Sequence, residues 1–216
     1  MRGGISRSYV VSWAVRTTGN GARPDVRVSG CEVLIVDDHP LMRRGLACVL
    51  ETEGHRVVGE VPGGEEALSL LESLSPDLMT VDLSLPGIGG IELIRRARSL
   101  RPDLRSLVVS RHDEDLYAER VLRAGARGFV SKLEVPEVLS VAVRRVLDGR
   151  IYLSDRASAR LLSRIAEVGA ERLDRSPLAA LSDRELEVFE LVGAGRTTRE
   201  IAERLHLSVK TVESYK

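Results

Sequence analysis

The strongest constraint on the fold of this 216-residue chain is a two-part pattern that recurs five times between residues 32 and 148. Each repeat joins a short apolar run to a longer amphipathic segment. The first run, at 33–36, is mostly β-branched and has no polar interruption, which favours a strand covered on both faces. The pattern predicts strands at 33–36, 56–60, 77–82, 105–110 and 128–132, followed in turn by helices at 41–53, 65–73, 89–100, 115–124 and 136–147.

Strand–helix alternation of this kind predicts an α/β domain with a five-stranded, parallel, doubly wound sheet of the flavodoxin-like type. Right-handed crossovers place helices on both faces of such a sheet. Ligands then bind beyond the carboxyl ends of the strands, near the point where the strand order reverses. The residues that follow the strands are therefore the first candidates for function.

Polar groups follow four of the five predicted strands, and together they form a specific set. It comprises three carboxylates, one hydroxyl and one ammonium group: Asp37, Asp38, Asp82, Ser110 and Lys132. Carboxylates packed together repel one another unless a cation intervenes. An all-oxygen set favours a hard cation such as Mg²⁺. The set therefore predicts a magnesium site, with Asp82 presented to solvent at a strand end just before a Pro-Gly turn.

A carboxylate beside a bound divalent cation can accept a phosphoryl group. One aspartate attacks, the metal and Lys132 neutralise the phosphoryl oxygens, and Ser110 donates a hydrogen bond. His39 borders this set, and the favoured interpretation of it is a solvated loop histidine.

Beyond residue 149 the pattern changes to helices alone. A linker helix is predicted at 151–168, with Ser154 or Asp155 as its start signals. The polar stretch at 169–177, bounded by Gly and Pro, is typical of a tether. Capping boxes at 182–185 and 197–200 open two short helices, and Ser208 caps a third. Short helix, brief turn and short helix is the layout of a helix-turn-helix, a small all-α module.

Apolar residues recur at helical spacing in the first two of these helices. They are Leu186, Phe189 and Val192 in the first, and the inward-facing Ile201, Ala202 and Leu205 in the second. We divide the chain into an extension at 1–30 that is expected to be disordered, an α/β domain at 31–149, a linker at 150–178 and the helical module at 179–216.

Composition adds few constraints. Lys plus Arg and Asp plus Glu both number 32, so the net charge gives no indication of a nucleic-acid or membrane partner. Cys31 and Cys48 lack metal-like spacing and are interpreted as core thiols in a reducing cytosol. No apolar run approaches the roughly 20 residues that span a bilayer. We therefore expect a cytoplasmic protein with no membrane partner.

Residues 32–148 resemble the receiver domain of bacterial two-component response regulators. The matching elements are the VDDHP sequence at 36–40, Asp82 with the Pro-Gly turn at 86–87, Ser110, the AGA sequence at 124–126 and the GFVSK sequence at 128–132. The resemblance implies that Asp82 is a phosphoacceptor, charged from a phosphohistidine on a sensor histidine kinase.

The resemblance also implies roles for the neighbouring residues. Asp38 and Asp82 bind Mg²⁺ directly with help from the Ser84 carbonyl, and Asp37 acts through water. Lys132 pairs with the phosphate, while Ser110 and Phe129 form a switch pair that moves inward on phosphorylation.

Three residues depart from the receiver pattern. Phe129 lacks the hydroxyl of the Tyr often found there, so its switch is a packing change. Arg111 follows Ser110 where many relatives have a small residue, and it narrows access to the phosphate or contacts it. Leu133 replaces the Pro that often follows the Lys, which affects the geometry of the local loop.

The C-terminal module resembles the LuxR-type DNA-binding domain in its sequences LSDRELEV at 181–188, GRTTREIA at 195–202 and SVKTVESY at 208–215. A receiver followed by this module is similar to the NarL/FixJ subfamily of response regulators. The resemblance implies that the third helix enters the major groove and that dimers read paired half-sites. By position, Lys210 and Thr211 contact phosphate, and Glu213 and Ser214 face base edges.

The chain stops at Lys216, where relatives continue the third helix and add a fourth. A three-helix remnant of under about 40 residues is marginal as an independent core. The segment 179–216 carries six Lys or Arg against seven Asp or Glu, so it is not basic. We therefore expect weak or no DNA binding from this form.

The leading interpretation is a transcription factor, not a turnover enzyme, in which phosphorylation of Asp82 frees the module and promotes homodimerisation. The alternative is a truncated regulator that acts only through protein contacts. A dehalogenase-type phosphatase is disfavoured because Ser84 replaces the second Asp that such enzymes need. A nucleotide or flavin site is disfavoured because no glycine-rich loop follows the first strand.

Overall fold

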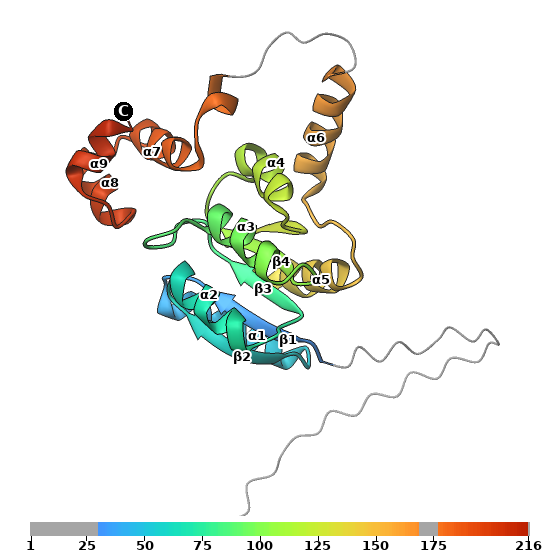
Figure 1. Ribbon diagram of the computed structural model, residues 1–216. Coiled ribbons are helices and arrows are strands. Elements are labelled where there is room, and N and C mark those ends of the chain that lie inside the picture. The colour runs from blue at the N-terminus through green and yellow to red at the C-terminus, as the bar shows by residue number, and fades with distance from the viewer. Residues whose placement is uncertain (1–29, 169–176, 216) are drawn as a thin grey trace, which may run out of the picture.

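The computed structural model describes residues 30–168 and 177–215 (Figure 1). Apart from residue 30, the extension at 1–30 that was expected to be disordered lies outside the described residues, as do most of the predicted tether and Lys216. Within them, no helix is long and apolar enough to cross a membrane.

A parallel sheet of five strands forms the centre of the larger domain, as predicted. Its order is β2-β1-β3-β4-β5, and its members are β1 (Glu32–Val36), β2 (Arg56–Val61), β3 (Leu78–Val81), β4 (Arg105–Ser110) and β5 (Gly128–Ser131). The first strand shows why the sheet is buried on both faces. Val33 and Ile35 pack into one apolar cluster, and Leu34 and Val36 pack into the other.

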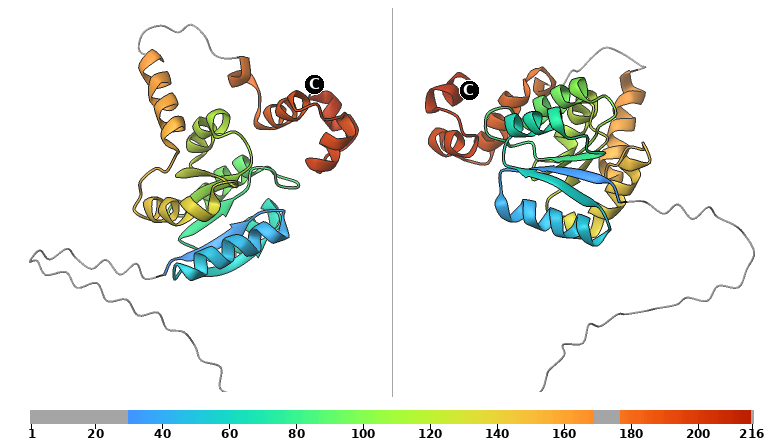
Figure 2. Two further views of the ribbon diagram at one scale, coloured as in Figure 1. Left: turned by 180° about the vertical axis from the view of Figure 1, so that it is seen from behind. Right: turned by 60° about the horizontal axis from the view of Figure 1, so that its bottom comes forward.

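Helices cover both faces of this sheet (Figures 1 and 2). They are α1 (Pro40–Thr52), α2 (Gly64–Ser73), α3 (Gly90–Leu100), α4 (Glu114–Ala124) and α5 (Val135–Leu147). Helices α1 and α5 bury their apolar residues in one cluster, and α2, α3 and α4 bury theirs in the other. The strand order reverses between β1 and β3, so the residues after these two strands meet at the switch point.

One prediction about a buried residue needs correction. Cys48 is exposed, because α1 turns Ala47 toward the sheet and Cys48 toward solvent.

The linker helix α6 (Asp155–Val168) lies within the predicted range and begins at Asp155, one of the two predicted start signals. The residues before it are not helical, because Tyr152 pairs with Gly128 at the edge of the sheet. Arginines of α6, among them Arg160 and Arg164, then form ion pairs with Asp115 and Glu119 of α4.

The C-terminal module consists of η1 (Pro177–Ala180), α7 (Asp183–Gly193), α8 (Thr198–Arg204) and α9 (Val209–Ser214). Both predicted capping boxes are present, at the starts of α7 and α8, and Ser208 caps α9. Ile201, Ala202 and Leu205 face inward as predicted. The residues of α7 that fill the module's core are Val188 and Leu191.

The apolar face predicted for α7 is therefore wrong in part. Phe189 and Val192 are 52% and 43% exposed, whereas Leu186 is buried against the core of the sheet domain rather than in its own module. The physical reason is that α7 packs on two sides at once, with one stripe toward α8 and α9 and another toward the sheet domain.

Candidate functional site

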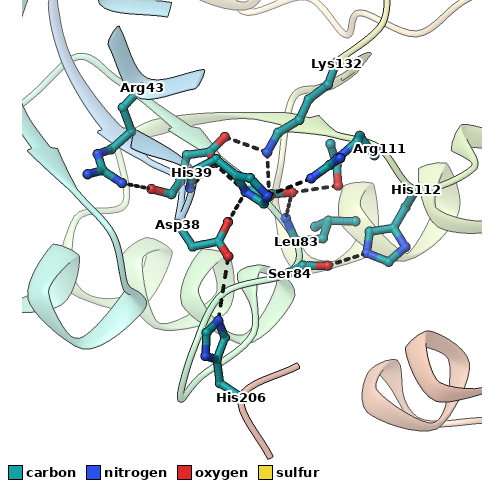
Figure 3. Close-up of polar contacts among 12 residues, drawn as sticks. Asp38, His39, Arg43, Leu83, Ser84, Arg111, His112, Lys132 and His206 are labelled. Carbon is teal, nitrogen blue, oxygen red and sulfur yellow. Dashed lines mark hydrogen bonds and ion pairs between the residues drawn. The ribbon is translucent and has the colours of Figure 1, made fainter. Parts of the chain in front are cut away.

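Asp82 lies directly after β3, but its side chain is only 4% exposed and is not presented to solvent as predicted. The backbone N–H of Leu83 and the hydroxyl of Ser110 donate hydrogen bonds to its Oδ1 atom over 2.7 and 2.8 Å. The ammonium group of Lys132 donates to its Oδ2 atom over 2.6 Å (Figure 3). Both oxygens of this buried carboxylate are thus held in a fixed direction.

Glycines shape the loop that follows Asp82. Gly87 has a φ of +69°, which favours glycine in the turn after Pro86. A Cβ atom added at Gly90 would lie 2.2 Å from the carbonyl oxygen of Asp82. The first turn of α3 therefore packs directly against the backbone of Asp82, which fixes where the strand ends.

Lys132 joins the ends of β1 and β3. Its Nζ atom lies 2.7 Å from Asp37 Oδ2 and 2.6 Å from Asp82 Oδ2, and its side chain is 3% exposed. Burial and the negative charge of Asp82 raise the pKa of the Asp37 carboxyl, and Lys132 opposes this shift. The backbone N–H of His39 also donates to Asp37 Oδ1 over 2.9 Å.

Asp38 faces the open side of this cluster. The His39 Nδ1 atom contacts Asp38 Oδ1, and the Arg111 guanidinium contacts His39 Nε2 over 2.7 Å. Because a guanidinium can only donate, Nε2 accepts and the imidazole proton is on Nδ1, directed at Asp38. His39 is half-exposed, as expected of a loop histidine, but its ring is held on both sides.

The cluster fits a divalent cation. Ligand atoms of Asp37, Asp38, His39 and Asp82 all lie within 4.8 Å of one another. Three carboxylates against one ammonium group leave an excess of two negative charges. The donor set is mainly carboxylate oxygen, the ligand type that Mg²⁺ prefers, but it includes one imidazole that the predicted all-oxygen set did not.

The predicted switch residues are both buried. Ser110 is 0% exposed and donates to Asp82, whereas Phe129 is 1% exposed and lies in the apolar cluster shared with Tyr117. Arg111 lies at the rim of the site, where its side chain contacts His39.

The predicted DNA-contacting residues lie together on α9, away from the carboxylate cluster. Lys210, Glu213 and Ser214 are exposed. The backbone N–H of Thr211 donates to Ser208 Oγ, and its hydroxyl also contacts Ser208 Oγ, so Thr211 is partly occupied in capping its own helix.

Sequence reasoning missed the residues that join the carboxylate site to the C-terminal module. A cleft of about 530 Å³ is lined by Asp38, Asp82 and Ser110 on one side and by residues of α7 and α8 on the other. His206 Nε2 lies 3.8 Å from Asp38 Oδ2, and His112 contacts Ser84 (Figure 3). His112 also contacts Glu190 of α7. The position of His112, two residues beyond the end of β4, was a usable signal for a site residue, whereas Glu190 had none.

Sequence comparison identifies the two parts of the chain. The family described as response regulator receiver domain matches residues 33–144, and the family described as bacterial regulatory proteins, luxR family, matches residues 179–216. The chain therefore belongs to the response regulators that carry a receiver domain and a LuxR-type DNA-binding domain, the NarL/FixJ type.

Named relatives share this two-part arrangement. The response regulator UvrY of Escherichia coli (strain K12) is 39% identical over 186 residues, which cover 85% of this chain and 84% of UvrY. The response regulator GacA of Pseudomonas aeruginosa PAO1 is 35% identical over 186 residues, covering 86% of each chain.

A solved structure of RcsB from Salmonella enterica serovar Typhimurium, bound to promoter P1flhDC in the presence of the phosphomimetic BeF3⁻, has a similar fold. Its TM-score is 0.57 at 30% identity, and the match covers 87% of this chain and 89% of that one.

Proposed function

We propose that this response regulator is switched by phosphorylation of Asp82. The observation that carries the proposal is the set of contacts on the Asp82 carboxylate, which Leu83, Ser110 and Lys132 hold at the switch point of the sheet. The proposed donor is a phosphohistidine on a sensor histidine kinase. We retain 31–149 as the receiver, 150–178 as the linker and 179–216 as the DNA-binding module.

The chemistry is transfer of a phosphoryl group from nitrogen to oxygen. An Asp82 carboxylate oxygen attacks phosphorus, the P–N bond to the donor histidine breaks, and its imidazole leaves with the bonding electron pair. Ser110 and Lys132 already point at Asp82, so they are placed to receive the phosphoryl oxygens. The acyl phosphate stores the signal, and its hydrolysis is a slow reset rather than turnover.

We propose Mg²⁺ as the cation of this site, with Asp38, Asp82 and the Ser84 carbonyl as direct ligands and Asp37 acting through water. When bound, Mg²⁺ supplies positive charge that offsets the phosphoryl oxygens in the transition state. Lys132 must then exchange part of its contact with Asp37 and Asp82 for contact with phosphate.

The proposed output is transcriptional, in the cytoplasm. Phosphorylation releases the C-terminal module, which favours a homodimer that binds double-stranded DNA through α9. In this assignment Lys210 and Thr211 bind backbone phosphate, and Glu213 and Ser214 face base edges. Ser110 and Phe129 are the proposed switch pair inside the receiver, although in this structure both are already buried.

Acetyl phosphate with Mg²⁺, followed by intact mass measurement, tests the phosphoacceptor. Wild type should gain one phosphoryl group and Asp82→Asn none, because the amide cannot form the acyl phosphate. Lys210→Ala offers a separate test of output, since loss of a phosphate contact should weaken binding to all duplexes about equally and reduce the salt dependence. If wild type gains no phosphoryl group while folded, the proposed switch is wrong.

A further inference from the structure

The C-terminal module contacts the receiver through the two loops that flank the phosphoacceptor. These loops are 82–89, between β3 and α3, and 111–113, between β4 and α4. The Arg184 guanidinium on α7 donates to the carbonyl oxygens of Leu85 and Gly87 over 3.1 and 2.9 Å. It also pairs with Glu187, whose side chain is 3% exposed. The module is thus attached to the same loop that starts at Asp82.

His112 makes the second attachment, and it touches both sides. Its Nδ1 atom lies 2.6 Å from Glu190 Oε2 on α7, and its Nε2 atom lies 2.8 Å from the Ser84 hydroxyl (Figure 3 shows the Ser84 contact). A carboxylate can only accept, so Nδ1 carries the proton. In the neutral ring, Nε2 then accepts from Ser84, and each contact fixes the other through one rigid imidazole.

A second receiver residue, Tyr117, also contacts Glu190. The Tyr117 hydroxyl also donates to Glu190 Oε2 over 3.1 Å, and the rings of His112 and Tyr117 are 4.7 Å apart between centroids. Side chains of His112 and Glu190 are only 12% and 21% exposed. Two receiver side chains thus hold Glu190 in a contact that is only partly exposed, and a displacement of His112 costs one of these hydrogen bonds.

We propose that His112 is the positioning residue that transmits the state of the Asp82 loop to the DNA-binding module. This inference rests on the proposed function. Ser84 is the second residue after Asp82, and His112 is the second after Ser110, so both ends of the imidazole follow groups that contact the phosphoryl group. Rearrangement of either segment on phosphorylation breaks the Ser84–His112–Glu190 chain and releases α7.

This route differs from one that runs through Phe129. Phe129 is 1% exposed within the apolar cluster, whereas the Ser84–His112–Glu190 chain is continuous from the Asp82 loop to α7. The route through His112 thus requires no rotation of a core aromatic side chain. It predicts that the response to phosphorylation depends on the two nitrogen atoms of one histidine.

Two substitutions separate the two nitrogens of His112. In His112→Asn the amide nitrogen replaces Nδ1, which keeps the Glu190 contact and removes that to Ser84. In His112→Gln the amide replaces Nε2, which keeps Ser84 and removes Glu190. Arg95→Gln is the matched control, because Arg95 contacts Asp183 on α7 over 2.9 Å but touches neither loop.

The experiment uses the full chain with Cys48→Ser and spin labels at Leu100 and Arg199, both exposed positions on α3 and α8. Pulsed electron paramagnetic resonance measures the label-to-label distance, and hence the fraction of molecules with a released module, before and after treatment with acetyl phosphate and Mg²⁺. Intact mass measurement shows whether each variant carries the phosphoryl group. We expect wild type and Arg95→Gln to release the module on phosphorylation. His112→Asn should load the same phosphoryl group but release about fivefold less, and His112→Gln should be released about fivefold more before phosphorylation.

Full release of phosphorylated His112→Asn, or identical behaviour of the Asn and Gln variants, would overturn the role of His112. The same holds if wild type gains the phosphoryl group and the module stays docked, a result that leaves the phosphoacceptor intact. Absence of the phosphoryl group from every variant instead overturns the proposed function, and this inference with it.

Discussion

Two polar clusters lie at the carboxyl edge of the sheet, and they differ in which domain supplies their residues. Asp37, Asp82, Ser110 and Lys132 all belong to the receiver and are each no more than 7% exposed. The second cluster, around His112, is shared with α7, and its members are partly exposed. The first, the receiver cluster, is built from receiver residues, whereas the second, the shared cluster, exists only while the module is docked.

This difference sets what each cluster can do. A buried ion pair is costly to break, because removing one partner leaves a charge without compensation. The shared contacts are exchangeable, since every group regains water when the module leaves. A stable site that stores a covalent signal is therefore placed next to a contact that can be given up.

The largest expected effect is a loss of stability when the Lys132 ammonium group is removed from the receiver cluster. Lys132→Met leaves Asp37 and Asp82 adjacent and unpaired, so we expect a loss of about 3 kcal/mol in unfolding free energy without divalent cations. Millimolar Mg²⁺ should restore much of it, because a bound cation stabilises the folded state. Urea unfolding with and without Mg²⁺ measures this. An equal loss in both conditions would contradict the assignment of a cation site here.

An apolar truncation should affect docking without unfolding the receiver. Leu186 is 1% exposed and packs in the receiver's cluster, so Leu186→Ala should cost about 2 kcal/mol of docking free energy. Leu191→Ala is the matched variant, because Leu191 lies in the module's own core. We expect spin-label distances to report release for Leu186→Ala, and hydrogen exchange to report loosening of α8 and α9 for Leu191→Ala. Reversed results would refute the division of α7 into two packing stripes.

The receiver cluster could be predicted from sequence, because each of its residues is placed by the end of a single strand. Each of its groups lies at or just after a strand end, and parallel strands end at one edge, so the meeting of Asp82 with Lys132 was predicted from counting apolar runs, whereas the burial of Asp82 was not. The capping boxes were predictable for a similar reason, because each depends on residues within one short segment.

The shared cluster could not be predicted, because His112 and Glu190 are 78 positions apart in the sequence. One belongs to the receiver and the other to the C-terminal module, and they meet only where the two domains pack together. Helical spacing could not tell which apolar stripe of α7 meets its own module. Phe189 was therefore placed among the packing residues although it is 52% exposed. Periodicity shows that a helix has an apolar face but not which neighbour will cover it. Cys48 was misplaced in the same way, by one position on α1.

Loss of a helix cap should distinguish the docked end of the module from its free end. Ser182 caps α7 beside the docking residues Asp183 and Arg184, whereas Thr197 caps α8. Each Ala substitution should cost about 1 kcal/mol of local helix stability. Only Ser182→Ala should also raise the released fraction, because it loosens the turn that carries Arg184. Hydrogen exchange and label distances measure the two effects, and equal release by both variants would go against the contrast.

The smallest expected effect is a pH dependence of docking through Glu187. Burial raises the pKa of this carboxyl above its ordinary 4.5, and the charge of Arg184 offsets the shift only in part. Because the pKa of Glu187 is higher when the module is docked than when it is released, protonation of Glu187 favours docking. The contribution of Glu187 to docking is fully present below pH 4.5 and is lost as the pH rises through the pKa of the docked state.

The released fraction of unphosphorylated protein should therefore increase from acid toward neutral pH. Glu187→Gln should flatten this part of the profile, since the amide does not titrate, while Arg184 keeps its bonds to Leu85 and Gly87. Label distances across the acid range measure it. Glu213 is the control, because it is exposed on α9, and Glu213→Gln should leave the slope unchanged. An unchanged slope in Glu187→Gln would assign the pH response to another group and leave Glu187 as a packing residue of the exchangeable contact.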